Sequence, residues 1–518
     1  MPSPADSRRI SRQPRSLAVT LAVTLAATLL AGCGGAPTLS TGPGAGGADA
    51  MIPGDPAPER EHCHPLPATG RAGADLVIAL GQAVDPGHAP VPVNDAERTV
   101  FANLYETLTN VSCEGEVQPG LAESWRRLDE GRRWRIRLRP GAVFWDGTPA
   151  DAAAVLASWR RNEPLAHATG QPCPALWVSS GSGGLSAVDT RTLEIRLAEP
   201  QDDLPKLLAH PTLAVAARRD GWTWPVGSGP CRLAADTPRP LPDLVCRPNP
   251  HHRPAPRWRS LTFRCRPQAD PRDLLPAGVD LTVVRDQQAL AYYRGVPDVA
   301  TAPLPWDRLY ILLTPPGSSL DTDTARLAGS SAMTPAERIP WPRLDHHGCV
   351  GAGCPQLFGP TLGAAPLLLD PDPAYRARAG RRLWLPATDP DALAIGERIA
   401  AFLPDDLELT PADGPDLAGA ITEGSAAGYL VSLDTRYPTA CLTLAALLAR
   451  AAWLQQAAAE ADDACDAATA LMQDGRAGPL LRTRPALVWR GPLAGLTLAH
   501  DGALLLGGLG PAAEEATP

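Results

Sequence analysis

The stretch RWRIRLRPGAVFWDGTPADAAAVLASW, residues 133–159, combines patterns that predict a strand, a turn and a helix. Its first six residues alternate arginines with apolar side chains, which is the period of a strand with one buried face. Pro140-Gly141 ends this strand, and Asp146-Gly147 is a turn dipeptide, because glycine accepts positive φ and aspartate bonds nearby backbone. Thr148 and Pro149 suit the cap and the first position of a helix. We therefore interpret Asp146 as a turn residue rather than as a functional carboxylate.

Composition and charge limit the classes of function. The chain has 518 residues, of which 44% are hydrophobic and 20% charged, so it can form two or three globular domains. Its formal net charge of −9 argues against nucleic-acid binding through a basic surface. Lys206 is the single lysine, which leaves one candidate for any lysine-dependent covalent mechanism.

The N-terminus has the pattern of a lipoprotein signal peptide. Arg8, Arg9, Arg12 and Arg15 precede the apolar run of residues 16–33, SLAVTLAVTLAATLLAGC. Its ending, Leu-Ala-Gly-Cys, resembles the lipobox in which the cysteine thiol, here Cys33, receives a diacylglycerol. We expect residues 1–32 to be removed and residues 33–72, rich in Gly, Ala, Pro and Thr near their start, to act as a flexible tether.

Cysteine usage fits an exported protein. Eleven cysteines without Cys33 leave an even number for disulfides in an oxidising compartment. Three pairs are candidate disulfides by their flanking patterns: Cys231 with Cys246, Cys349 with Cys354, and Cys441 with Cys465. The other four cysteines allow three connectivities, which stay open: Cys63, Cys113, Cys173 and Cys265.

Strand and helix patterns alternate along the rest of the chain. A strand is expected at residues 75–80, a helix from residue 95, and a hairpin with its tip at Asp189-Thr190. Residues 381–413 predict a strand–helix–strand unit. These patterns indicate an α/β protein with mixed sheets and more than one domain.

Several short motifs follow one another in a distinctive order along the chain. They are Tyr105-Glu106-Thr107-Leu108, Pro119-Gly120-Leu121-Ala122-Glu123-Ser124-Trp125, Phe144-Trp145-Asp146-Gly147-Thr148-Pro149, Val188-Asp189 with Thr192-Leu193, Gly227-Ser228-Gly229-Pro230, Asn249-Pro250 and Gly278-Val279-Asp280. Their order resembles the bacterial extracellular solute-binding proteins of family 5, the receptors of ABC importers for peptides, nickel and related solutes. The resemblance covers about residues 75–510, and residues 105–155 carry most of it.

The resemblance implies a two-lobed fold of the type II periplasmic binding proteins, with mixed sheets and a ligand cleft between lobes that close like a hinge. It implies a first lobe of residues 73–304 with 480–518, including an extra subdomain at about 95–195, and a second lobe of residues 305–479. The implied partners are a peptide or another small solute, an ABC permease, and the membrane through the lipid anchor. We expect a monomer on the extracytoplasmic face of the cell membrane, without a cofactor or catalytic activity.

In peptide-binding members of the family, a second-lobe carboxylate near an aromatic residue pairs with the ligand's amino terminus. The nearest match is GYLVSLDTRYP, in which Tyr429 is the aromatic residue and Asp434 the carboxylate. A desolvated carboxylate can bind an ammonium group through a charge-assisted hydrogen bond. Loop polarity alone explains Asp434-Thr435 equally well.

Two other classes of function compete with this interpretation. Binding of a metal or metallophore, as in nickel-type members of the same fold, is suggested by His62-Cys63-His64 and by residues 345–354, DHHGCVGAGC. Adjacent histidines on a loop seldom converge on one ion, so we assign no metal ligands. A secreted hydrolase is less expected, because the chain has no G-x-S-x-G, H-E-x-x-H or phosphate-loop motif, and Ser228 fits a turn.

Overall fold

The computed structural model describes residues 63–66, 70–169, 184–197, 200–236, 243–316, 318, 320, 381–387, 389–402, 407–412, 414–434, 451–457 and 476–512. Contacts divide the chain into two units, residues 1–56 and 57–518, and all the described residues belong to the second. Within these described ranges, every helix is too short or too polar to cross a bilayer.

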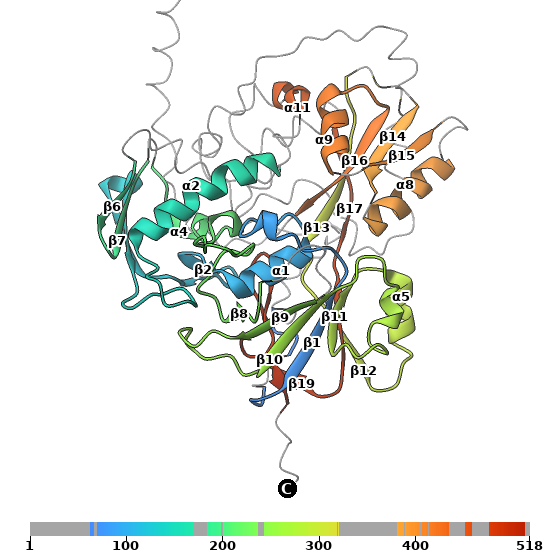
Figure 1. Cartoon of the computed structure of the whole chain (residues 1–518). Helices are drawn as coiled ribbons and strands as arrows, with labels where there is room; N and C mark the ends of the chain where they lie inside the picture. Colours follow the sequence, from blue (N-terminus) through green and yellow to red (C-terminus); the bar gives the residue numbers. More distant parts are fainter. Residues whose placement is uncertain are drawn as a thin grey trace, which may run out of the picture. The chain divides into compact units, whose positions relative to one another are not determined.

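The first sheet is mixed and has seven strands in the order β12-β18-β11-β1-β10-β9-β8 (Figure 1). β1 runs parallel to β10 and β11, whereas the other neighbours pair antiparallel. The strands are β1 (Asp75–Leu80), β8 (Cys231–Leu233), β9 (Asp243–Pro248), β10 (Ser260–Cys265), β11 (Leu281–Val284), β12 (Val299–Pro303) and β18 (Ala486–Arg490).

Helix α1 (Asp95–Leu104) covers part of this sheet. It begins after Asn94, whose side chain accepts the Glu97 amide as an N-cap. Its apolar side chains Val100 and Phe101 join one core cluster with the strand residue Phe263. Helix α5 (Gln287–Tyr293) follows β11 and packs into a second cluster on β1, β11 and β18.

The stretch at residues 133–159 contributes a strand to a separate antiparallel sheet with the order β4-β5-β7-β6. Helix α2 (Ala152–Ala168) covers the apolar face of this sheet, where Trp134 and Ile136 pack with Trp159 (Figure 1). The strands are β4 (Ala122–Leu128), β5 (Arg133–Leu138), β6 (Leu185–Asp189) and β7 (Thr192–Arg196). The predicted strand is confirmed, with the burial alternation that the arginines indicated.

The turn at Asp146 is confirmed, but the predicted start of the helix is wrong. Asp146 Oδ1 accepts both the amide and the hydroxyl of Thr148, at 3.0 and 2.7 Å. Residues 148–150 are extended and pair with residues 142–144, so Thr148 cannot cap a helix. Asp151 takes that role, because its carboxylate accepts the Ala154 amide at 2.9 Å and α2 begins at the next residue.

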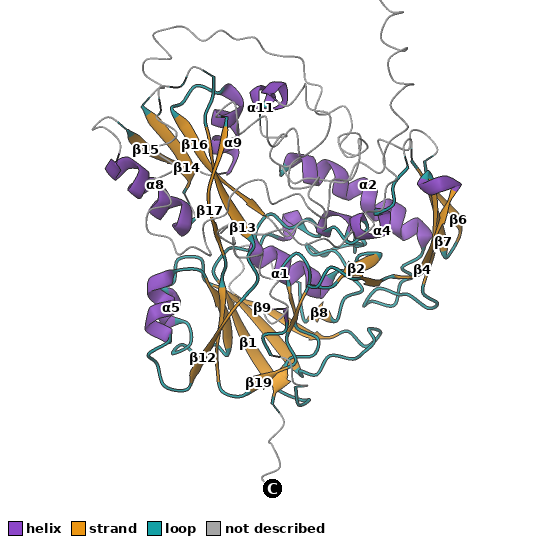
Figure 2. Cartoon of the chain, turned by 180° about the vertical axis from the view of Figure 1, so that it is seen from behind, coloured by secondary structure: helices purple, strands orange, loops and turns teal. Residues whose placement is uncertain are grey.

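The second main sheet has five strands in the order β15-β14-β16-β13-β17 (Figure 2). β14 is parallel to β15 and β16, whereas β13 is antiparallel to β16 and β17. The predicted strand–helix–strand unit is confirmed. The elements are β13 (Arg308–Leu313), β14 (Arg382–Pro386), α8 (Pro390–Phe402), β15 (Glu408–Ala412), α9 (Gly414–Glu423), β16 (Gly428–Asp434) and β17 (Ala477–Thr483).

Alternate residues of β13 point to opposite faces of this sheet and pack into two separate cores. Tyr310 and Leu312 pack with α8, whereas Leu309, Ile311 and Leu313 pack on the side of α9. This strand is apolar on both faces because helices cover both faces. The remaining short α-helices and strands of the described residues are α4 (Leu204–Leu207), α11 (Ala452–Ala457), β2 (Thr109–Val111), β3 (Val117–Pro119), β19 (Leu493–Ala494), β20 (Thr497–Leu498), β21 (Leu504–Leu505) and β22 (Gly510–Pro511).

Two short segments of described chain connect the two main sheets. One joins β12 to β13 and the other joins β17 to β18. They are hydrogen-bonded to each other, since the Leu304 amide donates to Pro485 O at 2.9 Å and the Asp307 amide to Thr483 O at 3.2 Å. The Arg484 guanidinium also lies 4.6 Å from the ring centre of Trp306. The lobe boundaries expected from the sequence remain a prediction.

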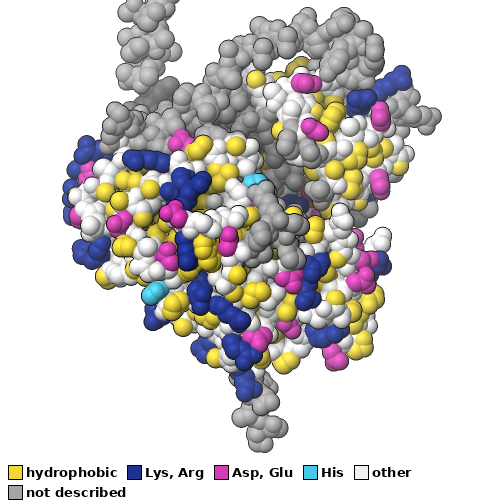
Figure 3. All heavy atoms as spheres, viewed as in Figure 1, with side chains coloured by type: hydrophobic (Ala, Val, Ile, Leu, Met, Phe, Trp, Pro, Cys, Tyr) yellow, Lys and Arg dark blue, Asp and Glu magenta, His cyan; other side chains and the backbone are white. Residues whose placement is uncertain are grey.

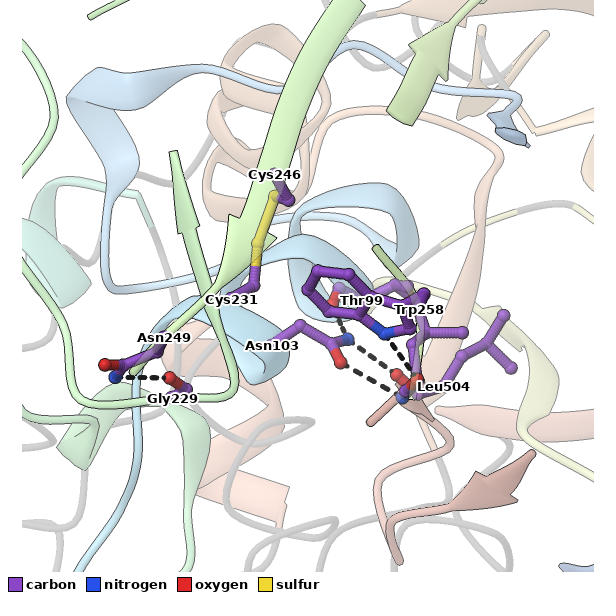
Figure 4. Close-up of a disulfide and its surroundings, with 9 residues drawn as sticks. Thr99, Asn103, Gly229, Cys231, Cys246, Asn249, Trp258 and Leu504 are labelled. Carbon is purple, nitrogen blue, oxygen red and sulfur yellow. Dashed lines mark hydrogen bonds between the residues drawn. A yellow bond between two sulfur atoms is a disulfide. The ribbon is translucent and has the colours of Figure 1, made fainter. Parts of the chain in front are cut away.

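The first sheet contains the disulfide expected between Cys231 and Cys246, which joins the antiparallel strands β8 and β9 (Figure 4). Beside it, Asn103 ties helix α1 to the C-terminal strands by donating to Thr99 O and Leu504 O, both at 2.7 Å. Cys63 pairs with Cys113, which settles part of the connectivity that the sequence left open. Cys265 is buried as a free thiol, and Cys33, Cys173, Cys349, Cys354, Cys441 and Cys465 lie outside the described residues.

Removing the β8–β9 disulfide is expected to lower the free energy of unfolding. Its two cysteines are 15 residues apart, and a loop of that size corresponds to about 3 kcal/mol of denatured-state entropy. The test compares urea unfolding of the Cys231→Ala/Cys246→Ala variant and the wild type without reductant. Cys265→Ala is the control for losing a buried sulfur without losing a crosslink. Equal urea midpoints for the double variant and the wild type would contradict the prediction.

Candidate functional site

The carboxyl ends of parallel strands in both main sheets carry polar and charged residues. In α/β folds, ligands bind outside the carboxyl ends of the strands, where helix N-termini also lie. Helix α1 begins near the end of β1, because the Gln82 side chain accepts the amides of Asp95 and Ala96 at 3.0 and 3.3 Å. In the second sheet, α8 begins just after β14, and β16 ends at Asp434.

Asp95 accepts hydrogen bonds from two arginines that belong to different sheets. Its Oδ2 lies 3.0 Å from Arg285 Nη2 and 2.7 Å from Arg308 Nη2. Arg285 follows β11 of the first sheet, and Arg308 begins β13 of the second. Arg285 also pairs with Asp307, in the segment that connects the two sheets, with Nη1 and Oδ1 3.0 Å apart. This carboxylate of Asp95 therefore joins the two sheets directly.

Arg308 continues the network into the second sheet. Its Nη1 lies 3.2 Å from Asp389 Oδ2, and the Tyr310 hydroxyl donates to both oxygens of Asp389 at 2.8 and 2.9 Å. Asp389 also accepts the amides of Asp391 and Ala392, so it caps the N-terminus of α8. We call Asp95, Arg285, Asp307, Arg308 and Asp389 the inter-sheet charge network.

The inter-sheet charge network is largely shielded from water. Side-chain exposure is 14% for Arg285, 16% for Arg308 and 8% for Asp389. Burial raises the pKa of Tyr310 well above its usual value, and the charge of Asp389 raises it further, so this hydroxyl stays a neutral donor. Burial lowers the pKa of Arg308, but the charges of Asp95, Asp389 and Asp307 more than offset this, and the guanidinium stays charged.

The network has three carboxylates and two guanidinium groups, so it carries excess negative charge in a shielded place. Charge-assisted hydrogen bonds are strong in such a place. The pKa of the nearby Asp391 carboxyl is raised by burial and then by Asp389. Across the described ranges, no group of three or more His, Cys, Asp and Glu side chains is arranged to hold a metal ion.

The structure places Asp434 next to this network and Tyr429 away from it. Asp434 is the last residue of β16 and pairs in register with Arg308. Tyr429 is five residues earlier, which is about 17 Å along a strand, and it pairs with Leu313 and Trp384. Tyr429 is fully buried in the core on the α9 side, where its hydroxyl accepts the Ala426 amide at 3.0 Å. The two residues are therefore not brought together.

The candidate metal ligands near the N-terminus have other partners. Cys63 is half of the disulfide with Cys113, so its sulfur is not a free thiolate. His64 Nε2 lies 2.8 Å from Glu114 Oε1. The second cluster, residues 345–354, and His62 lie outside the described residues.

Sequence reasoning did not predict Asp95, Arg285, Asp307, Arg308 or Asp389 as site residues. One signal was available, because Asp307-Arg308 directly precedes the apolar strand of residues 309–313. Charged residues that border a fully apolar strand mark its end and need partners. Nothing local indicates which distant partners they find, since residue 95 lies 213 positions from Arg308.

Comparison with known proteins supplies a family context. Residues 116–285 match the family described as bacterial extracellular solute-binding proteins, family 5 middle. The "probable deoxycholate-binding periplasmic protein" YgiS of Escherichia coli is 32% identical over 182 residues, 31% of this chain and 34% of that protein. The glutathione-binding protein GsiB of Escherichia coli is 30% identical over 173 residues, 31% of this chain and 32% of that protein. The chain thus aligns with about a third of the length of these curated relatives.

Solved structures show the same fold over most of the chain. The Escherichia coli murein tripeptide binding protein MppA has a TM-score of 0.62 at 18% identity, covering 86% of this chain and 100% of that one. NikA from Brucella suis, solved with Fe(III)-EDTA, has a TM-score of 0.59 at 19% identity, covering 84% and 99%. The fold is therefore that of the type II periplasmic binding proteins, as the sequence predicted.

Proposed function

We propose that this chain is the extracytoplasmic receptor of an ABC importer, and the match of residues 116–285 to the bacterial extracellular solute-binding proteins of family 5 supports this. It captures a solute, in the first place a peptide, and delivers it to the permease. The observation that carries the proposal is the family match within a chain that shares the fold of a solved binding protein over 86% of its length. The role is binding and delivery, without catalysis.

The names of relatives support a peptide as the ligand. GsiB is a glutathione-binding protein, and OppA of Salmonella typhimurium, 32% identical over 148 residues, is an oligopeptide-binding protein. The excess negative charge of the inter-sheet charge network is compatible with the ammonium group of a peptide. In this proposal Asp434 binds that ammonium group. Tyr429 serves as the core residue that holds β16 in place, because its ring and hydroxyl are both occupied inside the core.

The remaining parts of the proposal concern location and partners. Cys33 carries the lipid, and the mature protein is a monomer tethered to the extracytoplasmic face of the cell membrane. The two connecting segments act as the hinge, so that ligand binding favours a closed form that the permease recognises. The relatives' names place those proteins in the periplasm, which supports export.

Peptide binding is expected to depend on the ligand's free amine and on Asp434. Isothermal titration of the mature protein would compare peptides with free and acetylated amino termini. A hydrogen bond between charged groups is worth about 1.5–3 kcal/mol, so acetylation is expected to weaken binding about 10- to 100-fold. Asp434→Asn is expected to weaken binding of the peptide with a free amine to a similar extent, and to change binding of the acetylated peptide little. Asp298→Asn, at an exposed loop, is the matched control.

Two results would count against these assignments. Equal affinity for free and acetylated peptides would contradict the role of Asp434 in binding the amine, but the protein would still be a peptide receptor. Absence of binding across a peptide library would contradict the peptide itself. The similarity to NikA with Fe(III)-EDTA then favours the second candidate, a metal–chelate ligand, which the same titration tests with Fe(III)-EDTA.

A further inference from the structure

The sheet that contains β5 has an outer face rich in arginine, opposite the face covered by α2. Arg133, Arg135 and Arg137 alternate with three buried apolar residues of β5, so they share the outer face. Arg126 of β4 pairs in register with Arg135, and Arg196 of β7 pairs with Arg133. Residues directly opposite each other point to the same side of a sheet. These five arginines define what we call the arginine face.

The arginine face places like charges where they repel. The two register pairs, Arg126 with Arg135 and Arg133 with Arg196, each set one arginine directly across from another. Like charges in directly opposite positions destabilise a sheet. Ion pairs offset part of this repulsion, since Arg135 is also in register with Glu194 and Arg133 Nε lies 2.8 Å from Asp129 Oδ2. Departures from a local folding rule are expected at functional sites.

A single carboxylate lies under the centre of this face. Glu194 of β7 is 4% exposed, and its oxygens lie 2.7 Å from Arg196 Nη2 and 2.9 Å from Arg135 Nε. Arg137 and Arg196 remain 61% exposed, so most of each guanidinium faces water. The whole chain has a net charge of −9, but the arginine face and its edges together hold six arginines and four carboxylates. These residues are Arg126, Arg133, Arg135, Arg137, Arg191 and Arg196, with Glu123, Asp129, Asp189 and Glu194.

We propose that the arginine face docks on the anionic phospholipid headgroups of the membrane that anchors the protein through Cys33. The inference rests on the lipid anchor of the proposed function. Arginine's planar fork of donors matches the oxygens of a phosphate group, and each phosphate relieves the repulsion between opposite arginines. Figure 3 shows dark blue side chains at the left margin, in the region of β6 and β7 in Figure 1, and others down the middle of the view.

Covalent attachment makes weak contacts of this kind effective. Cys33 and the first described residue, Cys63, are 30 positions apart, so the chain between them spans at most about 105 Å. The body of an anchored protein stays within that distance of the membrane, and its effective concentration at the surface is high. The attraction extends about one Debye length, about 8 Å at physiological salt, so it orients the body only when the face meets the surface.

The test measures arginine reactivity on the lipidated full-length protein. The protein is reconstituted in vesicles of phosphatidylcholine, or of an equal mixture with phosphatidylglycerol, and modified with phenylglyoxal. Mass spectrometry then reports each arginine separately. We expect Arg135, Arg137 and Arg196 to react roughly fivefold more slowly with the anionic vesicles, and raising NaCl to about 0.5 M to remove the difference. Arg259, which is 68% exposed and directly precedes β10 of the first sheet, is the internal control, and its reactivity should not change.

A pair of variants separates docking from general charge effects. Arg126→Gln/Arg137→Gln is expected to abolish the lipid-dependent protection of Arg135 and Arg196. Arg259→Gln/Arg272→Gln, with the same change in charge at exposed positions elsewhere, is expected to retain it. Equal melting temperatures would show that both variants fold.

Three results would overturn the inference. Equal reactivity in both kinds of vesicle, with the Cys33 lipid confirmed by mass, would remove membrane docking and leave the receptor function intact. A chain without lipid on Cys33 would remove its premise. If the arginines were protected from phenylglyoxal only after a permease was added, and equally in both kinds of vesicle, the arginine face would bind a protein partner instead.

Discussion

Replacing Arg308 by methionine is expected to lower the free energy of unfolding by about 3–5 kcal/mol, because it leaves buried carboxylates without their counter-charge. Arg308 is 16% exposed and pairs with Asp95 and Asp389. Methionine keeps most of the apolar volume and removes the charge. Arg294→Met, at an exposed position after α5, is the matched control and should change stability by less than about 0.5 kcal/mol. Urea unfolding measures both.

A second variant tests whether Asp95 is the group that joins the sheets. Asp95→Asn leaves Arg285 paired with Asp307 and Arg308 paired with Asp389, so each arginine keeps one carboxylate partner. The loss is therefore expected to be smaller than for Arg308→Met. If Arg308→Met and Arg294→Met unfolded at the same urea concentration, the network would have no role in stability. If Asp95→Asn cost as much as Arg308→Met, Asp95 would do more than connect the sheets.

Gly227→Ala is expected to cost about 3 kcal/mol or more, near the upper end for a side chain forced into a packed site. A methyl group on Gly227 would lie 1.9 Å from Leu104 O and 2.6 Å from the Tyr105 ring. The first of these is backbone, so relief requires the end of α1 and the 227–230 turn to separate. That turn also accepts the Trp145 amide at 2.9 Å through Gly227 O.

Gly81→Ala is the matched control, because a methyl group there has no heavy atom within 4 Å. Thermal and urea unfolding of the two variants would be compared with the wild type. A Gly227→Ala variant as stable as the control would show that the packing of the turn against α1 is loose. The expected loss would also explain why the motifs at residues 105–108, 144–149 and 227–230 occur together, since they meet at one junction.

Local sequence patterns determine many of this protein's strands, turns and helices without reference to tertiary contacts. The alternation in residues 133–138 requires one buried and one solvated face, and Asp146-Gly147 requires a turn, because both follow from the geometry of adjacent residues. The resemblance of the motif order to family 5 further implied the two-lobed fold. The local pattern places the start of α2 three residues too early, because the pairing of residues 148–150 with 142–144 competes with the helix and is not visible in that pattern.

The candidate site depended on the tertiary structure. Tyr429 and Asp434 are close in sequence, yet an extended strand holds them about 17 Å apart, with the tyrosine in the core. Asp95, Arg285, Arg308 and Asp389 are distant in sequence and meet because the carboxyl ends of β11 and β14 lie near the start of β13. Sequence alone determined the elements, since short-range sterics and burial periodicity act between neighbours. Only the tertiary structure decided which charges meet, because shielded charges take their partners from whatever distant segment the packing brings within hydrogen-bond distance.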